Sequence, residues 1–186
     1  MAQATAQRMI ALLALRIAQD YAAAGVHEEG GNNRGDQVEF FQRLMGGAPG
    51  DSWCADFVCS CLVKAYARFH KLPEDRDKLP GYVHQAAEVL LPLSGSCREL
   101  AAAARAKGML HSRDFTPSPG DLVLYDFPDA NGDRKGYPHH VGIAIAFPED
   151  VEGNTSGPAG GSQSDGGGVY TKTRNREDVF GFIHFA

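Results

Sequence analysis

The chain has 186 residues, of which 43% are hydrophobic and 22% charged, and its formal net charge is −5. This composition is usual for a soluble globular protein with a real core, so we expect residues 1–186 to form a single domain and a monomer. The net charge gives no reason to expect nucleic-acid binding, which requires a basic surface, and it argues against binding an anionic membrane surface. No apolar run is long enough to span a membrane.

The first predicted helix covers residues 5–24. Its apolar run, Met9 to Leu15, follows Arg8 and is interrupted by Arg16, while the helical pattern continues to Tyr21. The run is short for a signal peptide. We therefore interpret it as a helix of the domain, in a protein made in the cytoplasm without a signal peptide.

A second helix is predicted from Asp36 to Leu44, after a glycine and asparagine loop. A third should begin near Cys54 and end near His70, because apolar residues recur along it at helical spacing. Asp51 or Ser52 can serve as its N-cap, since a short side-chain oxygen can accept a bond from a free helix N–H. Cys54 would then lie in the first turn of a buried helix.

The second half of the chain changes from a helical to a strand-like period. A short helix is predicted over 83–90, and Ser96 with Glu99 fits a capping box that starts a helix ending near Lys107. A glycine and serine loop is expected over 156–167. Strands are predicted over residues 122–125, 141–147, 151–155, 169–173 and 179–183. Helices followed by strands indicate an α+β domain, with N-terminal helices packed on an antiparallel sheet of about five or six strands.

The four cysteines do not form a disulfide framework. Cys54, Cys59 and Cys61 crowd onto one predicted helix, and no CxxC pair typical of a zinc site is present. Reduced thiols are the simpler interpretation. Cys97 also opens a predicted helix and is a rival reactive thiol, but no histidine element is assigned to it, so we interpret it as structural.

Cys54 is the candidate nucleophile, because the positive end of a helix dipole favours a thiolate. A base is available in His139 and His140, which point to opposite faces if they lie on a strand. Glu152 and Asn154, two residues apart, would share a face of the next strand and could flank one imidazole. Each residue taken alone has an ordinary structural interpretation; their joint occurrence favours catalysis.

Four motifs together resemble a CHAP domain, a cysteine- and histidine-dependent amidohydrolase or peptidase. They are Trp53-Cys54-Ala55-Asp56-Phe57-Val58, Pro119-Gly120-Asp121-Leu122-Val123, His140-Val141-Gly142-Ile143 and Glu152-Gly153-Asn154-Thr155. The resemblance implies a papain-like α+β fold and cleavage of amide bonds in the peptide part of bacterial cell walls. It makes Cys54 the nucleophile, His140 the general base and Glu152 the orienting group, with Asn154 as a fourth polar member. Whether Glu152 or Asn154 holds His140 stays open.

Two further groups of residues are candidates for binding. Trp53 and Asp56 flank Cys54 and are expected to bind substrate, although Trp53 can equally pack the helix onto the sheet. Oxygen ligands that suit calcium lie close together in one polar loop, at Asp126, Asp129, Asn131 and Asp133. The loop lacks the closing glutamate of an EF-hand, and such residues are common in hairpin turns. We favour the turn, with no metal required, and keep calcium as the alternative.

The resemblance implies that the stem peptide of bacterial peptidoglycan is the substrate. The protein would act on the wall after release at lysis, as a phage endolysin, or after injection, as a toxin that requires an inhibitor protein in the producing cell. The alternatives are a papain-like amidase acting on a protein or small amide, and a catalytically silent module that binds wall peptides. The sequence does not indicate which amide bond is cut.

Overall fold

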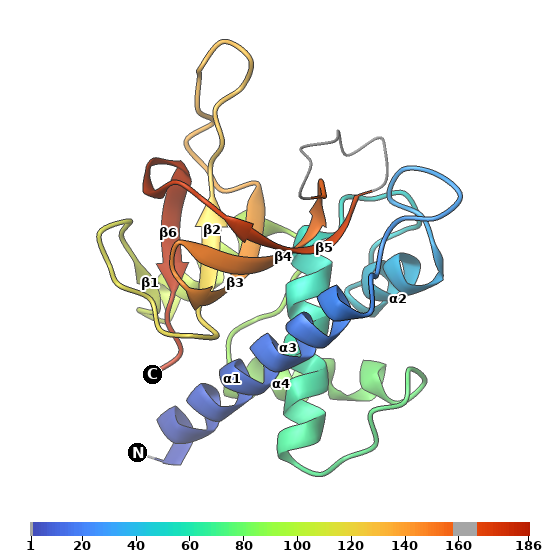
Figure 1. Ribbon diagram of the computed structural model, residues 1–186. Coiled ribbons are helices and arrows are strands. Elements are labelled where there is room, and N and C mark those ends of the chain that lie inside the picture. Colours follow the sequence, from blue (N-terminus) through green and yellow to red (C-terminus); the bar gives the residue numbers. More distant parts are fainter. Residues whose placement is uncertain (1, 158–166) are drawn as a thin grey trace.

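The computed structural model describes residues 2–157 and 167–186 (Figure 1). Residues 158–166 of the expected glycine and serine loop lie outside the described residues. The helices of the described part are α1 (Ala2–Ala23), α2 (Asp36–Leu44), α3 (Cys54–Phe69), η1 (Leu79–Tyr82), α4 (Val83–Val89), α5 (Cys97–Ala106) and η3 (Arg176–Asp178). The strands are β1 (Leu110–His111), β2 (Leu122–Tyr125), β3 (His140–Ala146), β4 (Glu149–Thr155), β5 (Gly168–Thr173) and β6 (Val179–Ile183).

The strands form one six-stranded antiparallel sheet in the order β1-β6-β2-β3-β4-β5. This confirms the predicted α+β class, with helices first and strands afterwards. The sequence did not indicate β1, whose two residues are too few to show a period. Two cross-strand pairs matter for the site, because Tyr125 lies opposite His140 and Gly142 lies opposite Glu152.

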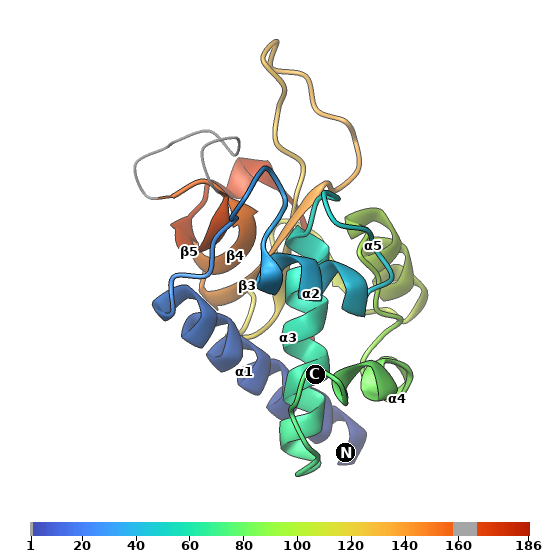
Figure 2. The same ribbon diagram turned by 90° about the vertical axis from the view of Figure 1, so that its right-hand side faces the viewer.

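Helix α3 lies at the centre of the molecule. All but three of its residues are buried, which explains why its apolar pattern extends around most of the helix. It packs against α1, α2 and α4 and against β3 and β4 (Figures 1 and 2). The N-terminal end of α3 therefore lies where the helical layer meets the sheet. None of the helices within the described residues is long and apolar enough to cross a membrane.

The sheet has apolar side chains on both faces. Leu122, Leu124, Val141 and Ile143 belong to the main core with the helices. The alternate residues form a smaller cluster on the other face, made of Val123, Tyr125, Ala144, Val179 and Phe182. Strand β2 is consequently buried on both sides, and its continuous apolar run reflects that position.

The start of α3 differs from the prediction. Trp53 is the N-cap residue, and no side chain caps the helix. Asp51 instead accepts a hydrogen bond from the Ala48 N–H (2.8 Å), and the Ser52 hydroxyl accepts one from Asn154 (2.9 Å). Both predicted caps are therefore held by other donors, and Cys54 becomes the first residue of the helix.

Candidate active site

The Cys54 thiol lies at the uncapped N-terminus of α3 and is only 4% exposed. Its sulfur is 3.8 Å from the sulfur of Cys97 and 4.0 Å from the carbonyl oxygen of His139. Because no side chain caps α3, the free N–H groups of its first turn are available to an anion. This end of the helix suits both a thiolate and an oxyanion.

His140, the first residue of β3, faces Cys54. Its imidazole is buried and lies close enough to the Cys54 thiol to lower the pKa of that thiol. Its Nε2 lies 2.8 Å from Glu152 Oε2, so Nδ1 is the ring nitrogen left for the sulfur. His139 points away, with its Nδ1 3.5 Å from Asp126 Oδ1. The structure thus brings Cys54, His140 and Glu152 together in space. These are the three residues that the sequence motifs indicate as nucleophile, base and orienting group.

Glu152 is fully buried and has a second partner that the sequence analysis missed. Arg174, directly after β5, donates from Nε to Oε1 (2.6 Å) and from Nη2 to Oε2 (2.5 Å). Arg174 also donates to Thr155 Oγ1 (3.1 Å), and its guanidinium lies 4.9 Å from the centre of the Phe127 ring. A buried carboxylate is normally paired with a cation, so a basic partner for Glu152 could have been expected. The sequence does not indicate which Lys or Arg side chain is that partner.

Asn154 makes different contacts from Glu152. Its backbone adopts a left-handed conformation (φ 52°), and the pairing of β4 with β5 shifts between Glu152 and Thr155. Its Nδ2 donates to Ser52 Oγ (2.9 Å), which ties β4 to the segment before Cys54. Of the two residues that the sequence left open, Glu152 makes the hydrogen bond to the Nε2 of His140.

The charges of the site shift the pKa values of its members in opposite directions. The hydrogen bond with Cys97, together with His140, lowers the pKa of Cys54 well below its usual range despite burial. Burial opposes protonation of His140, but the charge of Glu152 and the hydrogen bonds to Cys54 and Glu152 raise its pKa to about 10. Burial also opposes ionisation of Glu152, yet Arg174 and His140 lower its pKa. The site therefore favours a thiolate–imidazolium ion pair at neutral pH.

The two residues expected to bind substrate are both buried. Trp53 is 0% exposed, stacks on Phe41 and donates from Nε1 to Glu28 Oε1 (3.0 Å). Trp53 therefore packs the helix rather than lining the cleft. Asp56 is 2% exposed and contacts the backbone of Gly95. Burial, with the charges of Cys54 and Asp51, raises its pKa to about 7.

A polar cleft of about 480 Å³ opens beside the imidazole of His140. Its lining has a basic and hydroxyl character and is formed by Ser52, Phe127, Lys135, His139, His140, Thr155, Ser156 and Arg174. No acidic side chain is among these residues. The cleft gives a polar substrate access to the base and to the segment just before Cys54.

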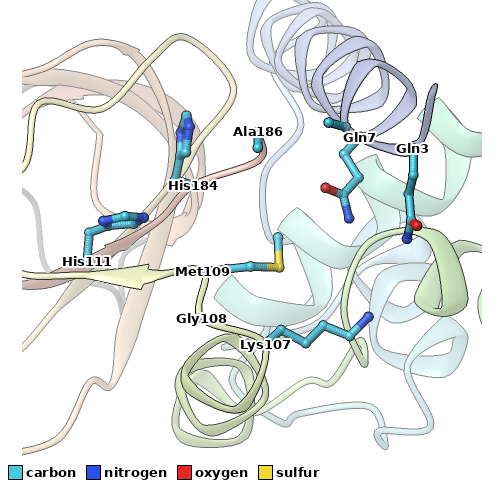
Figure 3. Close-up of a pocket in the computed structure, with 9 residues that line it drawn as sticks. Gln3, Gln7, Lys107, Gly108, Met109, His111, His184 and Ala186 are labelled. Carbon is cyan, nitrogen blue, oxygen red and sulfur yellow. The ribbon is translucent and has the colours of Figure 1, made fainter. Parts of the chain in front are cut away.

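A larger cavity lies elsewhere. It has a volume of about 610 Å³ and is lined by residues of α1, the end of α5 and the strands β1 and β6 with their flanks, including Gln7, Met109, His111 and His184 (Figure 3). Its lining contains no cysteine and no acidic residue. We therefore assign the chemistry to the smaller cleft, which is lined by His140, the residue that lies between Cys54 and the buried Glu152.

The acidic loop of the calcium hypothesis has the hydrogen bonds of a turn. Asp129 accepts from the N–H groups of Asn131 (2.8 Å) and Asp133 (3.0 Å), and Asp126 accepts from those of Lys135 (3.1 Å) and Gly136 (2.8 Å). Among the described residues, no group of three or more His, Cys, Asp or Glu side chains is placed to hold a metal ion. Calcium binding stays a prediction that this geometry does not favour.

Comparison with solved structures finds a protein whose backbone is arranged similarly. The chain is similar to the P60 domain of an antigen from M. avium subspecies paratuberculosis, with 14% identity, a TM-score of 0.47 and 96% of each chain covered. This likeness carries no conclusion about activity. No family model matches the sequence, and no curated protein matches it.

Proposed function

We propose that the protein is a cysteine-dependent hydrolase that cleaves amide bonds in the peptide part of bacterial peptidoglycan. One observation carries the reaction type. A cysteine that begins a buried helix lies beside a buried histidine that lowers the pKa of its thiol, and Glu152 Oε2 lies 2.8 Å from Nε2 of that histidine. This is the nucleophile, base and orienting group of a cysteine hydrolase. The wall substrate rests on the resemblance of the motifs to the CHAP family.

The charges and hydrogen bonds of the site support a two-step reaction. The Cys54 thiolate attacks the carbonyl carbon of the scissile amide, and the free N–H groups at the start of α3 stabilise the oxyanion. The C–N bond then breaks, and protonated His140 gives its proton to the leaving amine. A water molecule, deprotonated by His140, attacks the thioester. This second step releases a carboxylic acid and restores the ion pair.

The arrangement is costly to maintain without a function. A fully buried carboxylate, a buried imidazole and an uncapped helix end all lose hydration on folding, and the carboxylate is stabilised by His140 and Arg174. Apolar residues of the same size would stabilise a core more simply. The concentration of perturbed pKa values beside an open cleft supports catalysis.

The test is a digest of purified peptidoglycan by the wild type and by Cys54→Ala, with fragments identified by mass spectrometry. Cys61→Ala is the matched control, because Cys61 lies on the same helix and belongs to the main core. We expect fragments from the wild type and the control and none from Cys54→Ala. The masses will also identify the bond that is cut.

Other results separate the alternatives. Wall binding without fragments from the wild type would overturn the hydrolase proposal and favour a binding module. Fragments from both the wild type and Cys54→Ala would show that another group is the nucleophile. Cleavage of unrelated peptides but not of peptidoglycan would support the proposed reaction type and overturn the proposed substrate.

A further inference from the structure

Cys97 is the nearest thiol to the candidate nucleophile and comes from a separate helix. Its sulfur lies 3.8 Å from that of Cys54, within hydrogen-bonding range for sulfur, and it is only 6% exposed. Each cysteine is the first residue of its helix, Cys54 of α3 and Cys97 of α5. The sequence analysis interpreted Cys97 as structural, and this juxtaposition revises that interpretation.

The segment that carries Cys97 is fastened to α3. The Cys59 thiol donates to the carbonyl oxygen of Ser94 (3.4 Å). Gly95 lies so close to the Asp56 carboxylate that a Cβ there would overlap its oxygen. Ser96 caps α5 by accepting from the Glu99 N–H (3.4 Å). Contacts on both sides therefore fix the position of the Cys97 sulfur relative to that of Cys54.

Two thiols this close in a buried site cannot both ionise, because two thiolates would repel each other with little water to screen them. The surroundings decide which one keeps its proton. His140, paired with Glu152, is the charged group that favours the thiolate of Cys54. Cys97 has Cys54 as its side-chain hydrogen-bond partner, and that interaction raises its pKa. Cys97 is thus the neutral donor and Cys54 the charged acceptor.

We propose that Cys97 is a positioning residue whose S–H group donates to the Cys54 thiolate and holds that sulfur, ready to attack, between α5 and His140. The inference rests on the proposed role of Cys54 as the nucleophile. A hydrogen bond to a charged acceptor is stronger than one between neutral groups. Other titratable groups near the Cys54 charge are His140 from β3 and Asp56 and Cys59 from α3.

The test measures the ionisation of Cys54 directly, without a wall substrate. Iodoacetamide alkylates thiolates, and peptide mass spectrometry assigns the rate to Cys54 at each pH, with a thiol reductant present. We expect Cys97→Ala to move the midpoint of this profile upward by about one pH unit, which is about a tenfold loss of thiolate at pH values below the midpoint. Cys97→Ser keeps a donor and should restore most of the shift.

Controls separate this role from packing. Cys61→Ala removes another buried thiol and should leave the Cys54 profile unchanged, and thermal melting checks that each variant is folded. An unchanged profile in folded Cys97→Ala would overturn the inference, as would an equal shift in Cys97→Ser and Cys97→Ala. Because alkylation needs no peptidoglycan, a shifted profile in a protein that cuts no wall would support the role of Cys97 while overturning the proposed function.

Discussion

His140 and Arg174 share one carboxylate. Oxygen Oε2 of Glu152 lies 2.8 Å from His140 Nε2 and 2.5 Å from Arg174 Nη2, while Oε1 accepts from Arg174 Nε at 2.6 Å. The two bonds from Arg174 fix the plane of the carboxylate, and the carboxylate fixes the imidazole. The orientation of the base therefore depends on a residue that need not contact substrate.

Replacing Arg174 tests this dependence. Arg174→Gln removes one of the two cations that pair with the buried carboxylate of Glu152, so we expect the free energy of unfolding to fall by about 3 kcal/mol. Arg174→Lys keeps the charge but loses the bidentate geometry, so it should recover part of the stability and less of kcat/KM. Urea denaturation and kcat/KM give the two readouts. Arg16→Gln, which breaks an exposed pair with Asp20, should change stability by less than about 1 kcal/mol; an equal loss in this control would contradict the argument.

The pH dependence of the reaction follows from the paired charges. Cys54 must be deprotonated to attack and His140 must be protonated to give its proton to the leaving amine, so kcat/KM should be flat at neutral pH. It should fall on the alkaline side as His140 loses its proton, with a pKa of about 10. It should fall on the acid side only well below the usual pKa of a thiol, because the pKa of Cys54 is lowered.

Glu152→Gln provides the matching variant. It removes the negative charge that raises the pKa of His140, so the alkaline limb should move to lower pH. Glu149→Gln changes an exposed carboxylate of the same strand and should leave the profile unchanged. A Glu152→Gln profile that overlies the wild type would show that Glu152 does not control the charge of His140.

Gly142 leaves space for the acidic residues beside His140. A Cβ at this position would overlap the Asp150 carboxylate and lie 3.0 Å from Glu152 Cγ. Asp150 is itself held by the Tyr125 hydroxyl, which donates to it at 2.8 Å. We expect Gly142→Ala to destabilise the protein by about 2 kcal/mol and to lower kcat/KM. Gly81→Ala, at a position with open space, is the matched control for thermal melting; equal melting temperatures for the two variants would contradict the crowding.

Asn154 and Ser52 join the sheet to the segment before Cys54, and a double-mutant cycle measures that connection. Asn154→Gly suits the left-handed backbone while removing the donor, and Ser52→Ala removes the acceptor. Each should cost about 1 kcal/mol in the free energy of unfolding, and the double variant should cost less than the two together. Strict additivity would show that the hydrogen bond contributes no coupling energy.

The sequence correctly indicated the helices and strands whose hydrophobic period and turn residues agree with their burial in the fold. The bounds of α2, β2 and β6 match the predictions, and α3 ends one residue early. Their periods are set by burial and their ends by turn residues, both of which are visible in the chain. The predicted capping box of α5 is confirmed for Ser96, which caps the helix. It is wrong for Glu99, whose carboxylate accepts from the Ser94 hydroxyl.

The sequence could not indicate contacts that depend on how distant elements meet. Arg174 reaches Glu152 only because β5 pairs with β4 in one register, and Cys97 reaches Cys54 only because the start of α5 packs on α3. Ser52 does not cap α3 for the same reason, since Asn154 from β4 binds it, whereas Asp51 accepts locally from the Ala48 N–H. The motifs nevertheless indicated Cys54, His140 and Glu152. His140 and Glu152 lie on β3 and β4, which are consecutive in the chain and pair with each other.

The separation of the site residues along the chain determines when the chemistry can begin. During synthesis, α3 leaves the ribosome first, and the thiol of Cys54 is then an ordinary cysteine at the start of a helix. His140, Glu152 and Arg174 follow in that order, and they meet only when β3, β4 and β5 have paired and closed on α3. Because chains emerge from the N-terminal side, we expect the nascent protein to lack the proposed activity until the sheet is nearly complete.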